Sequence, residues 1–363
     1  MSITINPELD QILNKASGGE QLTTEEAVYL LELEDRADIE RVFDTARELK
    51  ERHFGKKIFL YGFVYFSTYC RNKCAFCYYR RTNEVSRRYR KDHGQVVDIS
   101  CELARSGVNL IDLTMGEDPF YHNDDQGAAS LAALVREVKE KTALPVMISP
   151  GVAGERMLQL LAEAGADWYA CYQETHNREL FSRTRLGQDY DLRMQCKRRA
   201  REKGLLIEEG LMVGIGETAF DIAFSLEAMR SLKAHQVRVM SFVPQEGTEM
   251  AEWPTPGRTR ELLTIALLRL SFPDRLIPAS LDVDGLAGLK QRLSAGANVI
   301  TSLIPPSIGL AGVAQSEMDI EEGLRSVREV TPVLAGLGLE AAGPEEYRDW
   351  INREKSILTR AAG

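Results

Sequence analysis

The segment IFLYGFVYFSTYCRNKCAFCYYRR, residues 58–81, decides the fold, because it joins a long apolar run to three closely spaced cysteines. Its first nine residues, 58–66, are aliphatic or aromatic apart from one glycine, a composition that favours a strand buried on both faces. Polar residues and cysteines follow at once and end the run. A strand of this kind is typical of a parallel sheet covered by helices, so strands and helices are expected to alternate along the chain.

Outward from this segment, apolar runs alternate with amphipathic stretches, and eight strands are predicted: 58–66, 109–115, 144–149, 167–174, 205–213, 236–243, 275–281 and 297–304. Several helical patterns between them end in glycine just before the next strand, as in SGVNL and AGADW, which is the usual stop for a helix. Eight units fit a closed (β/α)8 barrel of the TIM type better than an open doubly wound sheet.

The chain is expected to have three parts. Residues 1–56 form a helical extension, in which LTTEEAVYLLELE (22–34) carries a capping signature. Residues 57–305 form the barrel, and residues 306–363 supply a loop, the last barrel helix and a polar tail.

The composition limits the kind of protein. The net charge of −9 over 363 residues argues against a nucleic-acid partner, which would require a basic surface. The amino terminus does not resemble a signal peptide, and no apolar run is long enough to cross a membrane. Three of the six cysteines cluster and three stand alone, which is not a disulfide framework. We therefore expect a cytoplasmic protein with neither nucleic acid nor membrane as partner.

The three clustered cysteines, Cys70, Cys74 and Cys77, have the spacing C-x3-C-x2-C in what we name the cysteine loop (residues 67–81). The loop follows the first strand, so it lies on the face where α/β barrels place their active sites. A structural zinc site needs four ligands, and the nearest histidines are His53 and His93, outside the loop. Iron–sulfur clusters usually take four cysteines, so three would leave one iron open to a ligand. The spacing predicts an iron–sulfur cluster, with zinc as the alternative.

This spacing, with an aromatic residue before the third cysteine, resembles the signature of the radical S-adenosylmethionine superfamily. The resemblance implies a [4Fe-4S] cluster whose open iron binds S-adenosylmethionine and, when reduced, yields a 5′-deoxyadenosyl radical. The strand ends TMGED, YQETHN and GLMVGIGET resemble the family's cofactor-binding motifs. The positions that match the cofactor site in this way are Phe76, Tyr78, Met115, Gly116, Glu117, Asp118, Ser149, Glu174, Arg193 and Gly214.

Polar residues inside predicted barrel strands need a separate explanation, because an unpaired buried charge costs several kcal/mol. They are Asp112, Arg238, Ser280 and Asp282, from the second, sixth and seventh strands. Arginine matches a carboxylate in two-point contact, and aspartates can hold ammonium groups. These residues predict a site for a free amino acid, including a diamino acid, with an internal salt bridge as the alternative.

Longer runs resemble the 3-methylornithine synthase family, among them FVYFSTYCRNKCAFCYY, DLTMGEDP, YQET and RLIPASLD, and the similarity extends over residues 50–315. It implies conversion of L-lysine to (3R)-3-methyl-D-ornithine in pyrrolysine biosynthesis. It also implies that the four polar lumen residues hold the amino acid, and that a one-electron donor such as flavodoxin or ferredoxin is a partner. Related alternatives are biotin synthase, which needs ligands for a second cluster, and a hydrogenase-maturation enzyme.

The basic residues after the cysteines, Arg80, Arg81 and the run SRRYRK (86–91), are expected to form a solvated face. The alternative is a docking surface for an acidic electron donor.

Overall fold

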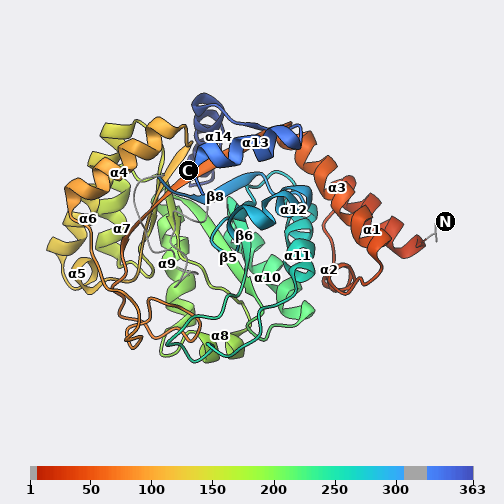
Figure 1. Cartoon of the computed structure of the whole chain (residues 1–363), viewed down its shortest axis with the longest axis horizontal. Helices are drawn as coiled ribbons and strands as arrows, with labels where there is room; N and C mark the ends of the chain where they lie inside the picture. Colours follow the sequence, from red (N-terminus) through yellow and green to blue (C-terminus); the bar gives the residue numbers. More distant parts are fainter. Residues whose placement is uncertain (1–5, 306–324, 363) are drawn as a thin grey trace.

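The computed structural model describes residues 6–305 and 325–362, and it contains the predicted barrel (Figure 1). Eight parallel strands form one sheet in the order β6-β5-β4-β3-β2-β1-β8-β7. The sheet nearly closes through a bridge between Gln236 and Leu276. The strands are β1 Lys57–Ser67, β2 Leu110–Met115, β3 Val146–Ser149, β4 Trp168–Ala170, β5 Leu206–Val213, β6 Gln236–Ser241, β7 Pro278–Ser280 and β8 Val299–Leu303.

Helices alternate with these strands and cover the outside of the barrel. Their first turns are capped as the sequence predicts, for example by Asp92 before α4 and Thr218 before α10, each in a capping box. Gly107 ends α4 at φ 97°, a left-handed conformation that favours glycine. The helices are α4 His93–Ser106, α5 Pro119–His122, α6 Asp125–Thr142, α7 Glu155–Glu163, α8 Arg178–Thr184, α9 Tyr190–Glu202, α10 Ala219–Leu232, α11 Arg258–Ser271, the 3-10 turn η1 Gly285–Gly288, α12 Leu289–Ser294 and α13 Val327–Gly336.

The amino-terminal extension consists of α1 Pro7–Ser17, α2 Thr24–Leu31 and α3 Arg36–Phe54. The expected capping signature is present, since Thr23 and Glu26 form a capping box at the start of α2. These helices pack on the outside of the barrel, where α2 and α3 contact α10 and α11 (Figure 1). They lie away from the loops that follow the strands.

The carboxyl-terminal segment differs from the expected polar tail. A short strand, β9 Glu340–Ala341, pairs with the start of β1, and α14 Pro344–Ala362 follows. Tyr347 and Trp350 of α14 are buried, and Trp350 stacks on Trp168 of β4 with ring centroids 5.8 Å apart. The helix therefore covers the amino-terminal end of the barrel, at the top of Figure 1. The predicted loop after Pro306 lies outside the described residues.

In the two described ranges, no helix has both the length and the apolarity to cross a membrane.

Candidate active site

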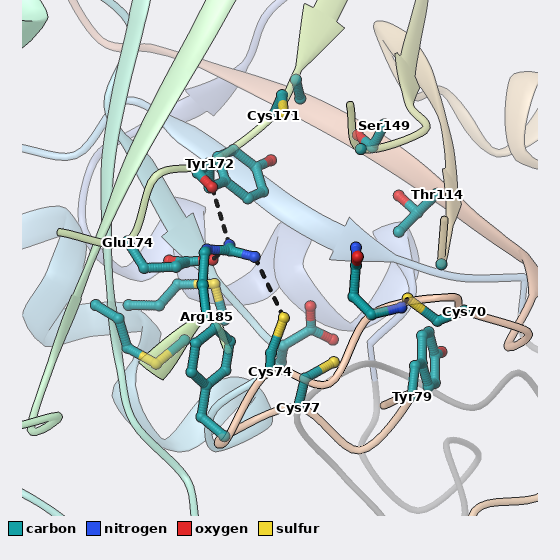
Figure 2. Close-up of a pocket in the computed structure, with 18 of the residues that line it drawn as sticks. Cys70, Cys74, Cys77, Tyr79, Thr114, Ser149, Cys171, Tyr172, Glu174 and Arg185 are labelled. Carbon is teal, nitrogen blue, oxygen red and sulfur yellow. Dashed lines mark hydrogen bonds and ion pairs between the residues drawn. The ribbon is translucent and has the colours of Figure 1, made fainter. Parts of the chain in front are cut away.

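A cavity of about 1230 Å³, its open mouth included, lies at the carboxyl ends of the strands. The cysteine loop supplies one wall, and the ends of β2 to β6 supply most of the rest. Figure 2 shows Cys74 and Cys77 close together on this wall with Cys70 beside them, while Thr114 and Ser149 approach from neighbouring strands. The structure thus places the three predicted ligands on the cavity wall.

The thiols are held in the manner expected of cluster ligands. Gln188 Nε2 donates to Cys74 Sγ at 3.0 Å and Arg185 Nη1 approaches the same sulfur at 3.5 Å, so donors from outside the loop hold this sulfur in place. Burial raises the pKa of Cys70 to about 11 and also raises the pKa of Cys77, so a cationic group is needed to keep these thiols deprotonated. A [4Fe-4S] cluster meets that need.

The alternative of a zinc site fits less well. Within residues 6–305 and 325–362, no group of three or more His, Cys, Asp or Glu side chains is arranged to hold a metal ion. A four-iron cluster has no such requirement, because each thiolate binds a separate iron. The donor set of three thiols beside an open cavity therefore fits the cluster.

The TMGED segment passes very close to the cysteine loop. A Cβ at Gly116 would lie 2.3 Å from the carbonyl oxygen of Tyr69 and 2.9 Å from Cys70 Cβ, so only glycine allows this approach. Met115, Gly116 and Glu117 all line the cavity beside the cysteines, where the resemblance predicts cofactor binding.

The acidic residues of this segment have different surroundings. Glu117 accepts from Arg71 Nε at 3.0 Å and from Arg193 Nη1 at 3.3 Å. Burial opposes its ionisation, but Arg193, the Val152 amide and Arg71 lower its pKa. Asp118 does not line the cavity, since it caps α5 and accepts from Ser67, Arg90 and the Phe120 amide. Its placement corresponds to a turn-forming role, and its predicted contact with the cofactor stays a prediction.

Glu174 lies on the opposite wall in a constrained backbone conformation. Its φ is 67°, which is unfavourable for a residue other than glycine by about 1–3 kcal/mol and is found most often at functional sites. Its carboxylate accepts from Arg185 Nη2 at 2.9 Å, and its backbone bridges to β5 at Leu211. Burial raises the pKa of Glu174, while Arg185 and Arg193 oppose that shift.

The remaining predicted cofactor residues fall into two groups. Phe76, Ser149 and Arg193 line the cavity. Tyr78 and Gly214 do not: the Tyr78 hydroxyl donates to the Val85 carbonyl, and the Gly214 amide donates to the Glu217 carboxylate. Their predicted contacts with the cofactor stay predictions.

The lumen below the cavity contains an arginine and two carboxylates close together. Arg238 donates to the Tyr172 hydroxyl at 2.9 Å, and its Nη1 lies 3.5 Å from Glu208 Oε1. Asp112 accepts from Thr114 and Ser149 through Oδ1, while its buried Oδ2 has no hydrogen-bond partner in the described part of the chain. Burial, reinforced by the charge of Glu208, raises the pKa of Asp112 to about 7.

Asp282 and Ser280 lie across the lumen from these residues, on the β7 side. Asp282 lines the cavity and accepts from Tyr65 at 2.8 Å, from Ser302 at 2.7 Å and from Arg325 Nη1 at 2.5 Å. Ser280 lies behind it and accepts from the Asp282 amide at 3.3 Å. Because Arg325 already neutralises Asp282, Asp282 alone does not provide the free negative charge that the sequence suggested.

The structure adds four residues that the sequence analysis did not select: Tyr172, Arg185, Glu208 and Arg325. Glu208 is a charged residue inside the apolar run LLIEEGLMV, so the reasoning that selected Asp112 and Arg238 could also have selected it. The adjacent Glu209 points to the helix side and pairs with buried Lys197. Tyr172 lies in the YQET run, whereas Arg185 and Arg325 carried no local signal.

The basic run after the cysteines forms the expected solvated face only in part, since Arg81, Arg87 and Arg90 are exposed while others are taken up by internal contacts. Arg80 is buried and pairs with Glu249, Arg88 donates to four backbone carbonyls, and Arg90 pairs with Asp118. The reason is that the long loop needs internal donors for carbonyls that no sheet satisfies. Arg81 remains exposed, as do Arg71 and, in part, Lys73.

A barrel whose first strand leads into three closely spaced cysteines is typical of radical S-adenosylmethionine proteins, and the model of the Radical SAM superfamily matches residues 64–238. The 3-methylornithine synthase of Methanosarcina acetivorans is 41% identical over 340 residues, covering 94% of this chain and 96% of the relative. A crystal structure of methylornithine synthase matches with a TM-score of 0.88 at 40% identity, covering 93% of this chain and 99% of that chain. The [FeFe] hydrogenase maturase subunit HydE of Thermotoga maritima is 30% identical, with 82% and 84% coverage. Within the superfamily, the chain belongs to the 3-methylornithine synthase family.

Proposed function

We propose that this enzyme isomerises L-lysine to (3R)-3-methyl-D-ornithine, in pyrrolysine biosynthesis. The observation that carries the proposal is the position of Arg238 on the cavity wall, with the Oδ2 of Asp112, unpartnered among the described residues, buried behind Thr114 and Ser149 and with Asp282, already paired with Arg325, across the lumen. A guanidinium suits the carboxylate of an amino acid, and carboxylates suit its ammonium groups. Membership of the 3-methylornithine synthase family supports lysine as that amino acid.

In this mechanism the protein binds, orients and excludes water. Cys70, Cys74 and Cys77 would hold the cluster, which with S-adenosylmethionine bound would supply the 5′-deoxyadenosyl radical. Glu174 and Arg193 orient S-adenosylmethionine beside the cysteine loop. Arg238 holds the lysine carboxylate, so that the side chain extends toward the cofactor. Lysine and S-adenosylmethionine would both lie in the cavity, where a carbon radical on either of them is protected from solvent.

The partner that supplies the electron is proposed to be a small acidic carrier such as flavodoxin or ferredoxin. Arg71, Lys73 and Arg81, all members of the cysteine loop, line a surface depression. Positive charge at this place would steer an acidic partner toward the cluster. The reduced thiols that the cluster needs favour the cytoplasm as the compartment.

The proposal is tested by one anaerobic assay. The reconstituted enzyme is incubated with lysine, S-adenosylmethionine and reductant, and the products are separated and analysed by mass spectrometry. We expect a new amino acid with the mass of lysine but a different retention time. If 5′-deoxyadenosine forms and no isomer of lysine appears, the substrate assignment is wrong.

Iron analysis distinguishes the proposed function from that of biotin synthase, because biotin synthase holds a second cluster inside the barrel. Apart from the three loop cysteines, Cys171 is the one cysteine among the described residues that lines the cavity. We therefore expect about four irons per chain. Measuring lysine binding distinguishes the proposed function from that of a hydrogenase-maturation enzyme, whose lumen is expected to bind a different ligand.

A further inference from the structure

Tyr172, two residues after β4, contacts both halves of the cavity. Its backbone carbonyl accepts from Arg193 Nε at 2.8 Å and from Arg185 Nη2 at 2.9 Å. Arg193 in turn holds Glu117, and Arg185 holds Glu174 and approaches Cys74. Figure 2 shows Arg185 between Tyr172 and Cys74. The main chain of Tyr172 therefore organises the cofactor half.

The side chain of Tyr172 organises the other half. Its hydroxyl donates to Glu208 Oε2 at 2.7 Å and accepts from Arg238 Nη1 at 2.9 Å. The guanidinium carbon of Arg238 lies 5.1 Å from the centre of the Tyr172 ring. Gly210 makes this packing possible, because a Cβ there would lie 2.9 Å from atoms of both side chains.

The contacts of Arg238 leave one edge of its guanidinium available. Nη1 is used by Tyr172 and Glu208, whereas the buried Nε has no hydrogen-bond partner among the described residues. The bond that Nη2 makes, to Thr301 Oγ1, is long at 3.4 Å. The Nε–Nη2 edge can therefore receive both oxygens of a carboxylate, the two-point contact that a planar guanidinium favours.

We propose that Tyr172 and Glu208 act as a positioning pair that fixes Arg238 with its Nε–Nη2 edge toward the substrate carboxylate. This inference rests on the proposed lysine isomerisation. Both carboxylate oxygens of Glu208 face Tyr172 and Arg238, so Glu208 acts through these two residues rather than on the substrate. It also supplies the negative charge that a buried guanidinium needs, without occupying the carboxylate edge.

The arrangement links substrate position to cofactor position. One residue holds the substrate arginine through its side chain and the cofactor arginines through its carbonyl, so its placement sets the distance between the two ligands. Loss of the hydroxyl alone should release Arg238 and leave Arg185 and Arg193 in place. Lysine should then be held less firmly, while S-adenosylmethionine binds as before.

The test uses reconstituted holoenzyme with Tyr172→Phe, Glu208→Gln and the double variant. For Tyr172→Phe we expect the lysine KM to rise about tenfold, since it loses a hydrogen bond to a charged group. More 5′-deoxyadenosine should form per product, and the Kd of S-adenosylmethionine should stay within about twofold of wild type. Glu208→Gln keeps an acceptor for the hydroxyl but removes the negative charge beside Arg238, so it should raise the lysine KM by at least as much. The double variant should fall short of the product of the two effects, because the residues act as a unit.

The matched control is Tyr347→Phe, which removes another buried tyrosine hydroxyl at the opposite end of the barrel, where it lies 2.6 Å from the Tyr61 hydroxyl. It should lower the melting temperature without changing the lysine KM. An unchanged lysine KM in Tyr172→Phe contradicts the proposal, and so does an equal loss of affinity for both ligands, which would indicate a merely structural role. A wild-type enzyme that does not convert lysine contradicts the proposed function and this inference together, whereas an active wild type with an unaffected Tyr172→Phe contradicts this inference alone.

Discussion

The two ends of the barrel use buried polar and aromatic residues in different ways. At the amino-terminal end, α14 covers the sheet with stacked aromatic rings, and the charges of Lys355 and Asp167 are paired. At the carboxyl end, Asp112 and Arg238 keep buried polar atoms without hydrogen-bond partners among the described residues, and these atoms lie beside the cavity, whereas atoms of the same kind at the amino-terminal end, such as Trp168 Nε1 and Gln236 Nε2, lie away from it. Such atoms are costly unless a ligand completes them. The difference indicates that one end stabilises the fold and the other is built around its ligands.

Positive φ occurs at both ends, but Ala143 and Lys233, at φ 55° and 51°, only end the helices α6 and α10. Glu174 and Ser302, both beside the cavity or the lumen, have φ near 67°. Ser302 donates to Asp282 at 2.7 Å, so its unusual conformation serves the lumen network. Unfavourable conformations of this kind persist where the surrounding structure holds a functional arrangement in place.

The largest effect is expected from the cysteine loop. Replacing Cys70, Cys74 or Cys77 by Ala should abolish the brown absorbance of the reconstituted protein and all turnover, because two thiolates hold the cluster poorly. Iron content and visible absorbance measure this. Cys101→Ala, on α4, is the control and should retain the cluster. A triple variant with full iron content would show that the cluster lies elsewhere.

A smaller effect is expected for Arg238→Lys, which keeps the charge and loses the planar fork. Removing a buried charged hydrogen bond costs about 2–5 kcal/mol, so the affinity for lysine should fall roughly 30-fold or more. The fold should be retained, since α14 and the outer helices are untouched. Turnover at low lysine concentration and the melting temperature are measured on the same sample. A folded, cluster-loaded variant with normal turnover would remove Arg238 from the site.

The pH dependence of lysine binding should depend on Asp112, whose pKa burial raises to about 7. In the ligand-free enzyme this favours the protonated form, so stability contributed by Asp112 is lost as the pH rises from about 4 to 7. A bound ammonium group favours the carboxylate, so lysine binding near pH 6 should release a proton and should tighten as the pH rises. Calorimetry in buffers of different ionisation enthalpy detects the proton. Asp112→Asn should abolish this release, and an unchanged release in that variant would assign it to another group.

At the amino-terminal end, substitution should change stability and leave catalysis alone. Trp350→Ala removes a buried ring and should lower the free energy of unfolding by about 3 kcal/mol. The lysine KM of the folded fraction should stay at the wild-type value, as measured below the lowered melting temperature. A change in KM would mean that the two ends are coupled, which would break the comparison.

The sequence predicted the barrel well because its signals are local. Eight apolar runs, helix caps and terminal glycines each depend on neighbouring residues, and the cysteine spacing lies within eight positions. The cover formed by α14 was missed because an amphipathic helix with many charges does not reveal what its apolar stripe contacts. Asp118 lies next to Glu117 in the same motif, but an ion pair with Arg90 holds its carboxylate in the turn. The motif alone does not show this contact. Arg185 and Arg325 enter the site through contacts between distant segments, which no local pattern records.

In the proposed mechanism, the cofactor radical takes a hydrogen atom from lysine held in this lumen. This step is tested most directly by incubating the reconstituted enzyme with fully deuterated lysine, S-adenosylmethionine and reductant, and measuring the mass of the recovered 5′-deoxyadenosine. We predict deuterium in the 5′-deoxyadenosine together with a deuterated isomer of lysine. Unlabelled 5′-deoxyadenosine, with lysine recovered unchanged, would contradict the account.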